Sequence, residues 1–472
     1  MAGTHRWPAL ALAILAAGVP QAARADRKLT LDEALALART KNRDLRGARE
    51  RIAEARAGVE QVRAQLLPNL VAQGRYTHNY KEVDFNIGAL TLPVAQLADI
   101  VRETSTDPAQ QAQLQMLSQG IKDATNAAPP VVISKQEQLD GNLAATVPII
   151  APSTWYALSA ANRSLEASEA TFQVSEASVL VAVAQAYFAA AGSDELVLAR
   201  QDAVKVATET FDVAKARVAA ELANQVEQTR AETALIRAQQ DLVEAQNTQG
   251  AAHRALATSV GVTEPIEVDR VVAVPAEPGA LDQLVTAGKS GRPEIAAQKA
   301  NIAAGTATER ADLFRWAPTL SGFANVHVQN YTGFSGDKYA WAIGLSLDWL
   351  LYDGGVRDAQ RHQVEAQRRE AEVRLELLDA TIADEVANAR GTLDAKRKAV
   401  TAATRSVELA KETLRLVRAQ YDAGTAKQLD VLTAQDGLVT AEVGLAQAHF
   451  EVALADLQLR RAAGTFPGRA AK

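Results

Sequence analysis

The sequence predicts an α+β membrane protein in which a few short amphipathic strands are joined to very long helices. Three observations lead to this fold class: four segments alternate apolar and polar residues, two long segments carry heptad repeats, and the two halves of the chain resemble each other. Alternation is typical of strands with one apolar face, and sustained heptads are typical of coiled coils. We therefore expect a strand region attached to an elongated helical coil.

Residues 1–25 predict a cleaved signal peptide. Their apolar stretch is shorter than the roughly 20 residues that span a bilayer, and Ala23, Arg24 and Ala25 fit a signal-peptidase site before Asp26. Beyond residue 25, no stretch approaches about 18 consecutive apolar residues. Any membrane crossing by the mature chain is therefore expected to be made by strands.

Composition excludes several classes of function. The chain has no cysteine, which rules out disulfides, thiolate metal sites, cysteine nucleophiles and a lipidated N-terminal cysteine. A formal net charge of −6 disfavours nucleic acid as a partner. The six histidines show no metal-ligand spacing, and no phosphate-binding glycine loop or nucleophile motif is present. We therefore assign no catalytic, cofactor-binding or metal-binding residue, and we do not expect an enzyme.

The two halves of the chain align without gaps in two blocks. An offset of 250 places Asn42 on Arg292 and Pro68 on Pro318, and an offset of 203 places Gly261 on Gly464. Chance similarity between alanine-rich helices is the alternative, but shared proline and glycine positions favour duplication. The expected organisation begins with a signal peptide 1–25 and ends with a tail 465–472, and a linker 262–292 separates two repeats. The first repeat, 26–261, is expected to contain a helix, strands near 70–80 and 138–148, and a helical hairpin 153–261. The second repeat, 293–464, is expected to contain a helix, strands near 320–331 and 339–350, and a hairpin 355–464.

Each predicted strand has one apolar face and about the length of a tilted outer-membrane strand, roughly 9 to 11 residues. Four strands cannot close a barrel that needs roughly eight, so several chains must share one barrel. A soluble sandwich is the alternative, but two isolated hairpins make a poor core. The residues expected to face lipid are Leu143, Trp341, Ile343, Leu345, Leu347 and Trp349.

The helices are too long for an ordinary domain. Residues 153–219 contain no strong helix breaker and would span roughly 100 Å at about 1.5 Å per residue. Apolar residues recur every seven positions along this segment and along the last helix. These heptads predict coiled-coil seams, with alanine layers that allow close approach. They are Leu165, Phe172, Val179 and Ala186, and Leu438, Leu445, Val452 and Leu459.

Several short motifs, in this order, resemble the TolC outer-membrane efflux family over residues 29–464. They are LTLDEA at 29–34, NRDL at 42–45, LLPNL at 66–70, VPIIAPS at 147–153, WLLYDGG at 349–355 and YDAGTAKQLDVL at 421–432. The resemblance implies a homotrimer with twelve strands in outer-membrane lipid, continuous with a periplasmic barrel of coiled helices. It also implies an exit duct of a tripartite efflux pump or type I secretion system, served by a periplasmic adaptor (membrane fusion) protein and an inner-membrane transporter. No cofactor is implied.

The resemblance assigns functions to the two hairpin tips. Contact with the adaptor is carried onto Glu221, Leu222, Tyr421, Gly424 and Thr425. An acidic channel entrance is carried onto Asp430, and the repeat adds Glu227 at the equivalent place; solvated positions on a coil are the equal alternative for these two acids. The chain has Ala426 where the family places an arginine, which argues against a latch through that residue.

Two questions stay open from sequence alone. A periplasmic coiled-coil protein that tethers the cell envelope is the main alternative to a duct, and it predicts a soluble protein without a pore. Drug, metal-ion and polypeptide cargoes cannot be separated from the sequence, although two methionines and no cysteine disfavour heavy-metal export. The polar insertion 81–130 is expected at the cell exterior without an assigned role.

Overall fold

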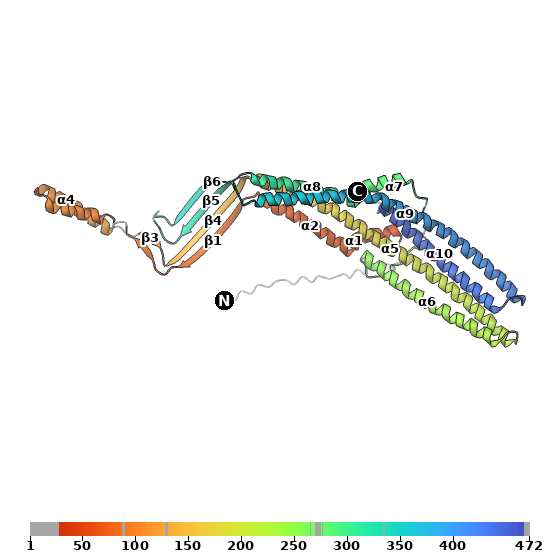
Figure 1. The fold of residues 1–472 in the computed structure, drawn as a ribbon. Coiled ribbons are helices and arrows are strands. Elements are labelled where there is room, and N and C mark those ends of the chain that lie inside the picture. Colours follow the sequence, from red (N-terminus) through yellow and green to blue (C-terminus); the bar gives the residue numbers. More distant parts are fainter. Residues whose placement is uncertain are drawn as a thin grey trace, which may run out of the picture. The chain divides into compact units, whose positions relative to one another are not determined.

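The computed structural model describes residues 28–86, 90–127, 131–264, 266–269, 275, 277–333 and 336–466. The expected signal peptide 1–25 and most of the expected tail lie outside these residues. The chain divides into two compact units (Figure 1). Unit 1 comprises Met1–Arg46, Ser175–Arg292 and Ile382–Lys472, and unit 2 comprises Gly47–Val174 and Pro293–Thr381. Each unit therefore combines segments from both halves of the sequence.

Unit 2 contains the four expected strands in one antiparallel sheet. Strands β1 and β4 form one hairpin, β5 and β6 form the other, and β4 pairs with β5 in the order β1-β4-β5-β6. Strands β1 and β6 are the two edges of this sheet. The strands are β1 Asn69–His78, β4 Glu137–Ile150, β5 Thr319–Gln329 and β6 Tyr339–Asp348.

The strand register collects most of the large apolar residues of the four strands on one face. Ala72, Leu143, Val326 and Trp341 lie opposite one another in one row across the sheet. Because directly paired residues point to the same side, the whole row shares a face. Trp341 is 70% exposed, and Ile343, two residues along the same strand and on the same face, is 74% exposed. No other part of unit 2 therefore packs on this face of β6.

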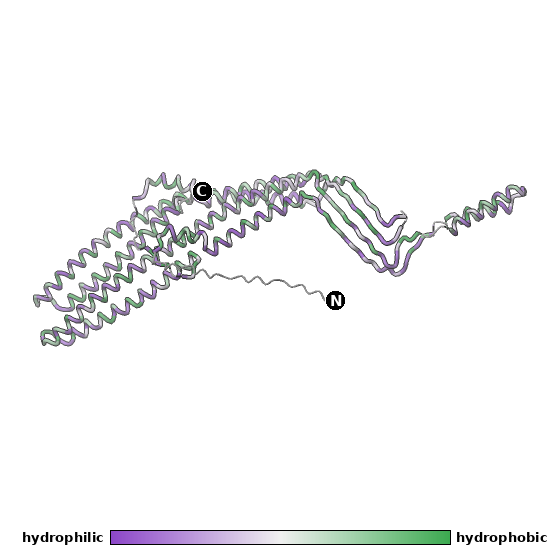
Figure 2. Tube along the Cα trace, turned by 180° about the vertical axis from the view of Figure 1, so that it is seen from behind, coloured by the Kyte–Doolittle hydropathy of each residue, from purple (hydrophilic) through white to green (hydrophobic). Residues whose placement is uncertain are grey.

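The opposite face of the sheet carries most of the polar residues, with Val71 and Phe323 as its large apolar members. Its corresponding row contains Gln73, Asn142, His327 and Ala340. Figure 2 shows the resulting alternation of apolar and polar residues along the strands. A sheet that is apolar on one side and polar on the other suits a barrel wall between lipid and water.

The segment between β1 and β4 is more structured than the sequence indicated. It contains a two-stranded sheet and a helical hairpin, whose helices are held by the Lys122 to Asp99 ion pair at 2.5 Å and by the Thr91 and Thr125 hydroxyls at 2.8 Å. The high glutamine content hid the helical pattern of this segment. Its elements are β2 Val83–Phe85, α3 Leu92–Thr104, α4 Pro108–Ala127 and β3 Val131–Ser134.

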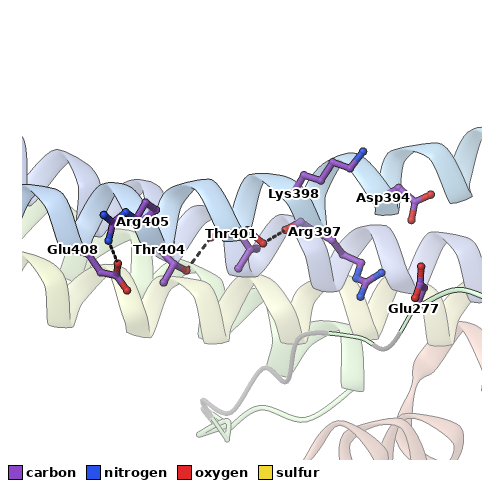
Figure 3. Close-up of a pocket in the computed structure, with 9 residues that line it drawn as sticks. Glu277, Asp394, Arg397, Lys398, Thr401, Thr404, Arg405 and Glu408 are labelled. Carbon is purple, nitrogen blue, oxygen red and sulfur yellow. Dashed lines mark hydrogen bonds and ion pairs between the residues drawn. The ribbon is translucent and has the colours of Figure 1, made fainter.

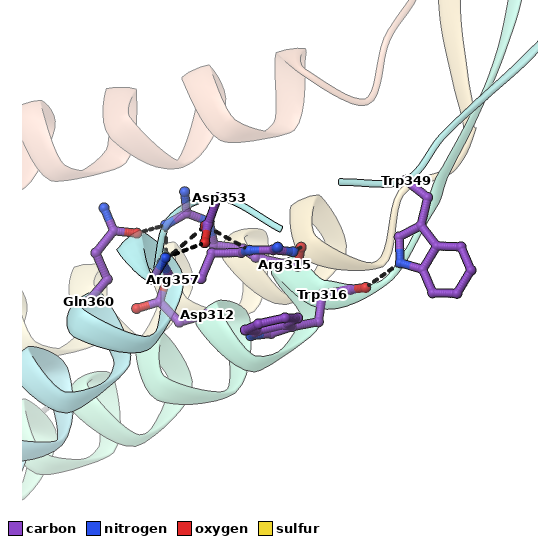
Figure 4. Close-up of polar contacts among 8 residues, drawn as sticks. Asp312, Arg315, Trp316, Trp349, Asp353, Arg357 and Gln360 are labelled. Carbon is purple, nitrogen blue, oxygen red and sulfur yellow. Dashed lines mark hydrogen bonds and ion pairs between the residues drawn. The ribbon is translucent and has the colours of Figure 1, made fainter. Parts of the chain in front are cut away.

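A buried arginine fixes the join between β6 and the long helix α9, Val356–Asp422. Arg357 is 4% exposed; its Nε donates to Asp353 Oδ2 at 2.8 Å, and its guanidinium lies 3.9 Å from the centre of the Trp316 ring (Figure 4). Asp353 also accepts from the backbone N–H of Arg357 at 3.1 Å, so it caps the helix. Trp349 Nε1 donates to the Trp316 carbonyl at 3.1 Å, which ties the end of β6 to the same corner.

Unit 1 contains the ends of two long helical hairpins. Helix α5 contains a stretch long and apolar enough to cross a membrane, by length and composition alone. That helix contributes Leu180, Val183 and Tyr187 to the buried cluster of unit 1, and 39% of the apolar stretch is buried within the protein. The hairpins are formed by α5 Pro152–Ala219 with α6 Gln225–Val260, and by α9 with α10 Gln428–Ala462.

The single helix expected before each strand pair is in fact two helices. Each pair breaks at a buried polar residue, Asn42 or Arg292, at equivalent places in the two repeats. Asn42 Oδ1 accepts from the Leu45 backbone N–H at 3.0 Å, and its Nδ2 donates to the Ser259 carbonyl at 2.7 Å. The helices are α1 Leu31–Lys41 and α2 Arg43–Ala64, then α7 Leu281–Gly291, inside the expected linker, and α8 Pro293–Leu313.

A glycine meets each of these breaks at close range. Gly261 has φ +94°, and a Cβ there would lie 2.5 Å from the Lys41 carbonyl oxygen. Gly464 has φ +65°, and a Cβ there would lie 2.9 Å from the Arg292 backbone nitrogen. Both positions therefore need glycine for the left-handed conformation and for the absent side chain.

We expect Gly261→Ala and Gly464→Ala each to destabilise the protein by about 2 kcal/mol or more, because backbone strain and a contact with main-chain atoms add. Gly437→Ala is the matched control, since Gly437 lies inside α10 and an added Cβ there would meet open space. Thermal denaturation in detergent measures the three variants. Equal melting temperatures for Gly261→Ala and Gly437→Ala would show that the close approach of Gly261 to the Lys41 backbone does not contribute to stability.

Candidate functional site at the hairpin tips

The two hairpin tips of unit 1 share one backbone design. The N–H of Leu222 donates to the Arg217 carbonyl and the N–H of Thr425 donates to the Gln420 carbonyl, both at 2.9 Å. Gly424 takes the left-handed conformation at φ +76°, and Glu221 takes it at φ +57° at the equivalent place. This is the usual glycine-centred ending of a helix, with a glutamate in the glycine position of the first tip.

A side-chain cap starts the returning helix at each tip. Asn224 Oδ1 accepts from the Val226 N–H at 3.3 Å, and Asp430 Oδ2 accepts from the Lys427 N–H at 2.9 Å. The predicted entrance acid Asp430 is thus exposed and engaged in the first turn of its own helix. A carboxylate at this place is also favoured by the helix dipole.

The other predicted entrance acid, Glu227, connects the two hairpins. Tyr421 Oη donates to Glu227 Oε2 at 3.0 Å, and Gln428 Nε2 donates to the Glu227 carbonyl oxygen at 2.6 Å. The Arg217 guanidinium lies 4.5 Å from the centre of the Tyr421 ring. We call Arg217, Glu227, Tyr421 and Gln428 the tip clamp. It joins α5 and α6 of the first hairpin to α9 and α10 of the second.

The electrostatics of the tip clamp keep Tyr421 as a hydrogen-bond donor. Burial raises the pKa of Tyr421, and its hydrogen bond to Glu227 raises that pKa further. The phenol therefore stays protonated at neutral pH. Gln428 is 4% exposed, so its hydrogen bond to Glu227 is shielded from water.

The sequence indicated some residues of this site and missed others. Tyr421 was expected to contact an adaptor, yet its hydroxyl points to Glu227 of the same chain. Glu221, Leu222, Gly424 and Thr425, the other expected contact residues, are exposed at the tips. Arg217 and Gln428 carry no signal in the sequence, because Arg217 is one of many helical arginines and the repeat pairs Gln428 with the exposed Gln225.

Beside the tip clamp lies a hollow of about 230 Å³ between α5 and the second hairpin. Two residues of the tip clamp line this hollow, and its charged lining residues include both acids and an arginine. The lining residues are Glu209, Thr210, Val213, Ala214, Arg418, Tyr421, Asp422, Gln428 and Val431.

A larger hollow of about 820 Å³ runs along α9 (Figure 3). It is lined by Glu277 and by charged residues of α9 such as Asp394, Arg397 and Lys398. Arg405 Nη1 bonds Glu408 Oε2 at 2.7 Å within it, so the charges are partly matched in place. Among the residues that the structure describes, no group of three or more histidines and acids could hold a metal ion.

Comparison with known families gives one match that covers most of the chain. The family model described as "Outer membrane efflux protein" matches residues 133–262 and 285–465. These residues include β4, β5 and β6 and both helical hairpins. The gap between the two matched blocks falls at the junction between the sequence repeats.

Curated relatives are similar over shorter stretches. Nodulation protein T from Rhizobium leguminosarum bv. trifolii is 28% identical over 306 residues, which cover 61% of this chain and 64% of that protein. Outer membrane protein TolC from Vibrio cholerae is 32% identical over 151 residues, covering 31% and 34%. Outer membrane efflux protein BepC from Brucella suis is 30% identical over 129 residues, covering 27% and 28%. The matches thus span less than two thirds of each of these relatives.

Solved structures share the fold at low sequence identity. A membrane protein from Pseudomonas aeruginosa superposes with a TM-score of 0.69 at 20% identity, over 92% of this chain and 90% of that one. The MtrE outer membrane channel of Neisseria gonorrhoeae, crystallised in its open state, gives 0.68 at 20% identity, over 92% and 88%. The outer membrane protein VceC from Vibrio cholerae gives 0.66 at 19% identity, over 92% and 96%.

Proposed function

Because the chain belongs to the outer membrane efflux protein family, we propose that it is an outer-membrane exit duct for substrates delivered by an inner-membrane transporter. The observation that carries the proposal is the sheet of unit 2, which has one continuous apolar face and one polar face. Such a sheet can separate lipid from a water-filled lumen. A periplasmic tether would leave the same apolar face, including Trp341 and Ile343, in water.

The unpaired sheet edges support a homotrimer. In lipid, the N–H and C=O groups at the edges of β1 and β6 need hydrogen-bond partners. Pairing β1 of one copy with β6 of the next satisfies both edges and closes a ring. Four strands are too few for a barrel and three copies supply twelve, within the range of known membrane barrels. The lipid-facing residues are then those predicted, Leu143, Trp341, Ile343, Leu345, Leu347 and Trp349.

The helical hairpins fit the periplasmic part of such a duct. We propose that the exposed tip residues Glu221, Leu222, Gly424 and Thr425 meet a periplasmic adaptor protein, while the tip clamp of Tyr421 and Glu227 holds the entrance narrow. Export across the inner membrane would use the signal peptide 1–25. The relatives named for efflux and for nodulation differ in their stated roles, and drug, metal-ion and polypeptide cargoes all fit an exit duct.

Asp430 and Glu227 would make the entrance of the duct negatively charged. Three copies of Asp430, and three of Glu227 within the tip clamp, would surround one axis in the trimer. Rings of carboxylates favour cations in a narrow pore. We therefore propose a cation-selective entrance, in which Asp430 contributes an exposed carboxylate and Glu227 contributes a half-buried one.

We expect detergent-solubilised protein purified from outer membranes to be a trimer of ~150 kDa, about three times the 50.2 kDa chain before signal removal. Native mass spectrometry measures this mass directly. A periplasmic coiled coil would instead be recovered without detergent, in the soluble envelope fraction. A stable monomer in several detergents would rule out the shared barrel.

A further inference from the structure

The helical hairpin between β1 and β4 exposes an apolar surface that the exit-duct proposal does not use. Ala95 and Ala98 of α3 are buried against α4, and Ser118 and Thr125 of α4 are buried against α3. Large apolar residues of the same two helices are exposed, with Leu97 at 60%. They are Leu92, Val94, Leu97, Ile100, Val101, Met116 and Leu117, and the exposed Leu90 lies just before α3.

Most of these residues gather on one face of the hairpin. Val94, Leu97 and Val101 are spaced by three and four residues, so they form one stripe along α3, and Leu90 continues this spacing just before the helix. Val94 and Leu97 each directly precede a packed alanine, and Leu117 directly precedes the packed Ser118. In an antiparallel pair of helices, the residues that directly precede the packed residues of each helix point to the same side of the pair. We call these five residues the hairpin apolar face.

We propose that the three hairpins of the trimer pack against one another through their hairpin apolar faces, outside the membrane. The proposal rests on the exit-duct trimer. The hairpin lies between the far ends of β1 and β4, opposite the ends that join the helices. Because β1 is an edge strand that pairs with a neighbouring copy in the trimer, each hairpin is anchored next to the adjacent chain.

The charge of the hairpin argues against an anionic lipid surface as the occupant, and its place beside the adjacent chain favours a second copy. The hairpin carries two cations, Arg102 and Lys122, and Lys122 is held by Asp99 at 2.5 Å. Its acids outnumber them: Asp99, Glu103, Asp107 and Asp123. A helix that lies on an anionic membrane is typically rich in lysine and arginine on its polar face. This hairpin has the opposite balance, so lipid headgroups would repel it.

The packing of the hairpin itself is independent of the apolar face. The Asp99 to Lys122 ion pair and the hydrogen bond between Thr91 and Thr125 lie between the two helices. Lys122 lowers the pKa of Asp99, so this ion pair persists at neutral pH. Substitutions on the apolar face can therefore test association without removing the contacts that hold α3 to α4.

The native chain has no cysteine, which allows a direct test by cross-linking. We expect Val94→Cys trimers, treated with a short bismaleimide, to give covalent dimers on denaturing gels, because each chain carries one thiol and the reagent joins two thiols. Gln96→Cys is the matched control, because residues two apart on a helix point to opposite sides. The yield from Val94→Cys should exceed that from Gln96→Cys at least about fivefold. Adding Leu97→Asp to Val94→Cys should remove most of the cross-linked product while the trimer persists.

Three outcomes are separable by native mass spectrometry and by spin labelling of parallel samples of the same variants. Intact trimers in which Val94→Cys cross-links no better than Gln96→Cys would overturn the inference and leave the exit duct standing. The second outcome is a Val94→Cys variant that does not cross-link and whose spin label is accessible to oxygen but not to a polar nickel reagent. This outcome would assign the hairpin apolar face to lipid and would also overturn the inference. Absence of trimers would contradict the exit-duct proposal and this inference together.

Discussion

Ile343→Arg is expected to abolish assembly of the protein in the outer membrane. Ile343 lies near the middle of β6 on the apolar face and is 74% exposed. An arginine facing lipid near the bilayer centre costs about 2–4 kcal/mol, and a trimer carries three copies, so the total is about 6–12 kcal/mol. Heat-modifiable trimers in outer-membrane fractions, detected on semi-native gels, should fall below detection.

The neighbouring residue gives a matched control for Ile343→Arg. Ala342 lies on the opposite, polar face of β6, directly across from Asn325 of β5. Ala342→Arg should therefore leave trimers at close to the wild-type level, since its side chain would enter water. If the two arginine variants assemble equally well, the apolar face does not contact lipid.

Tyr421→Phe is expected to open the entrance of the duct. The substitution removes the hydrogen bond from Tyr421 to Glu227 while it keeps the ring beneath Arg217. A partly exposed bond of this kind contributes about 1 kcal/mol, so three copies give about 3 kcal/mol, or about a hundredfold in the closed-to-open ratio. Single-channel recordings in planar bilayers should show a higher open probability and a larger mean conductance.

Alkaline pH should mimic this substitution in the wild-type channel. Because the pKa of Tyr421 is raised, the tip clamp is fully present below the ordinary tyrosine value of 10.0 and is lost as pH rises through the raised pKa. Tyr80→Phe is the control, since Tyr80 is 94% exposed and lies outside the tips. Conductance of Tyr421→Phe that matches Tyr80→Phe at neutral pH would show that the tip clamp does not restrict the pore.

The strands and the long helices were predictable because their patterns are local. Period-two alternation placed Trp341, Ile343 and Leu345 on one face, and the observed register agrees. Heptads and the lack of breakers predicted α5, and the sequence repeat predicted its partner α9; the bounds of both fall close to those expected. The resemblance to a family of outer-membrane efflux proteins was confirmed by the family model.

Features that depend on contacts between distant segments could not be predicted. The break at Asn42 looks like an ordinary helix position in sequence, whereas Pro293 marks the break at Arg292. Nothing local shows that the two breaks lie against Gly261 and Gly464, far away in the chain. The tip clamp has the same character, since Arg217, Tyr421 and Gln428 meet Glu227 only when the two hairpins are packed. The helical hairpin α3–α4 was missed because its glutamine-rich composition obscured the apolar stripe of α3. That stripe becomes evident only when the packing of α3 on α4 shows which apolar residues stay exposed.

The most direct test of a membrane-spanning exit duct is the reversal potential of the purified wild-type trimer in a planar bilayer under a salt gradient. We expect discrete conductance steps and a reversal potential on the cation-selective side, because polar strand faces line the lumen and acids surround the entrance. Trimers that insert from detergent yet produce no conductance steps, at neutral pH or above the pKa of Tyr421, would contradict the account.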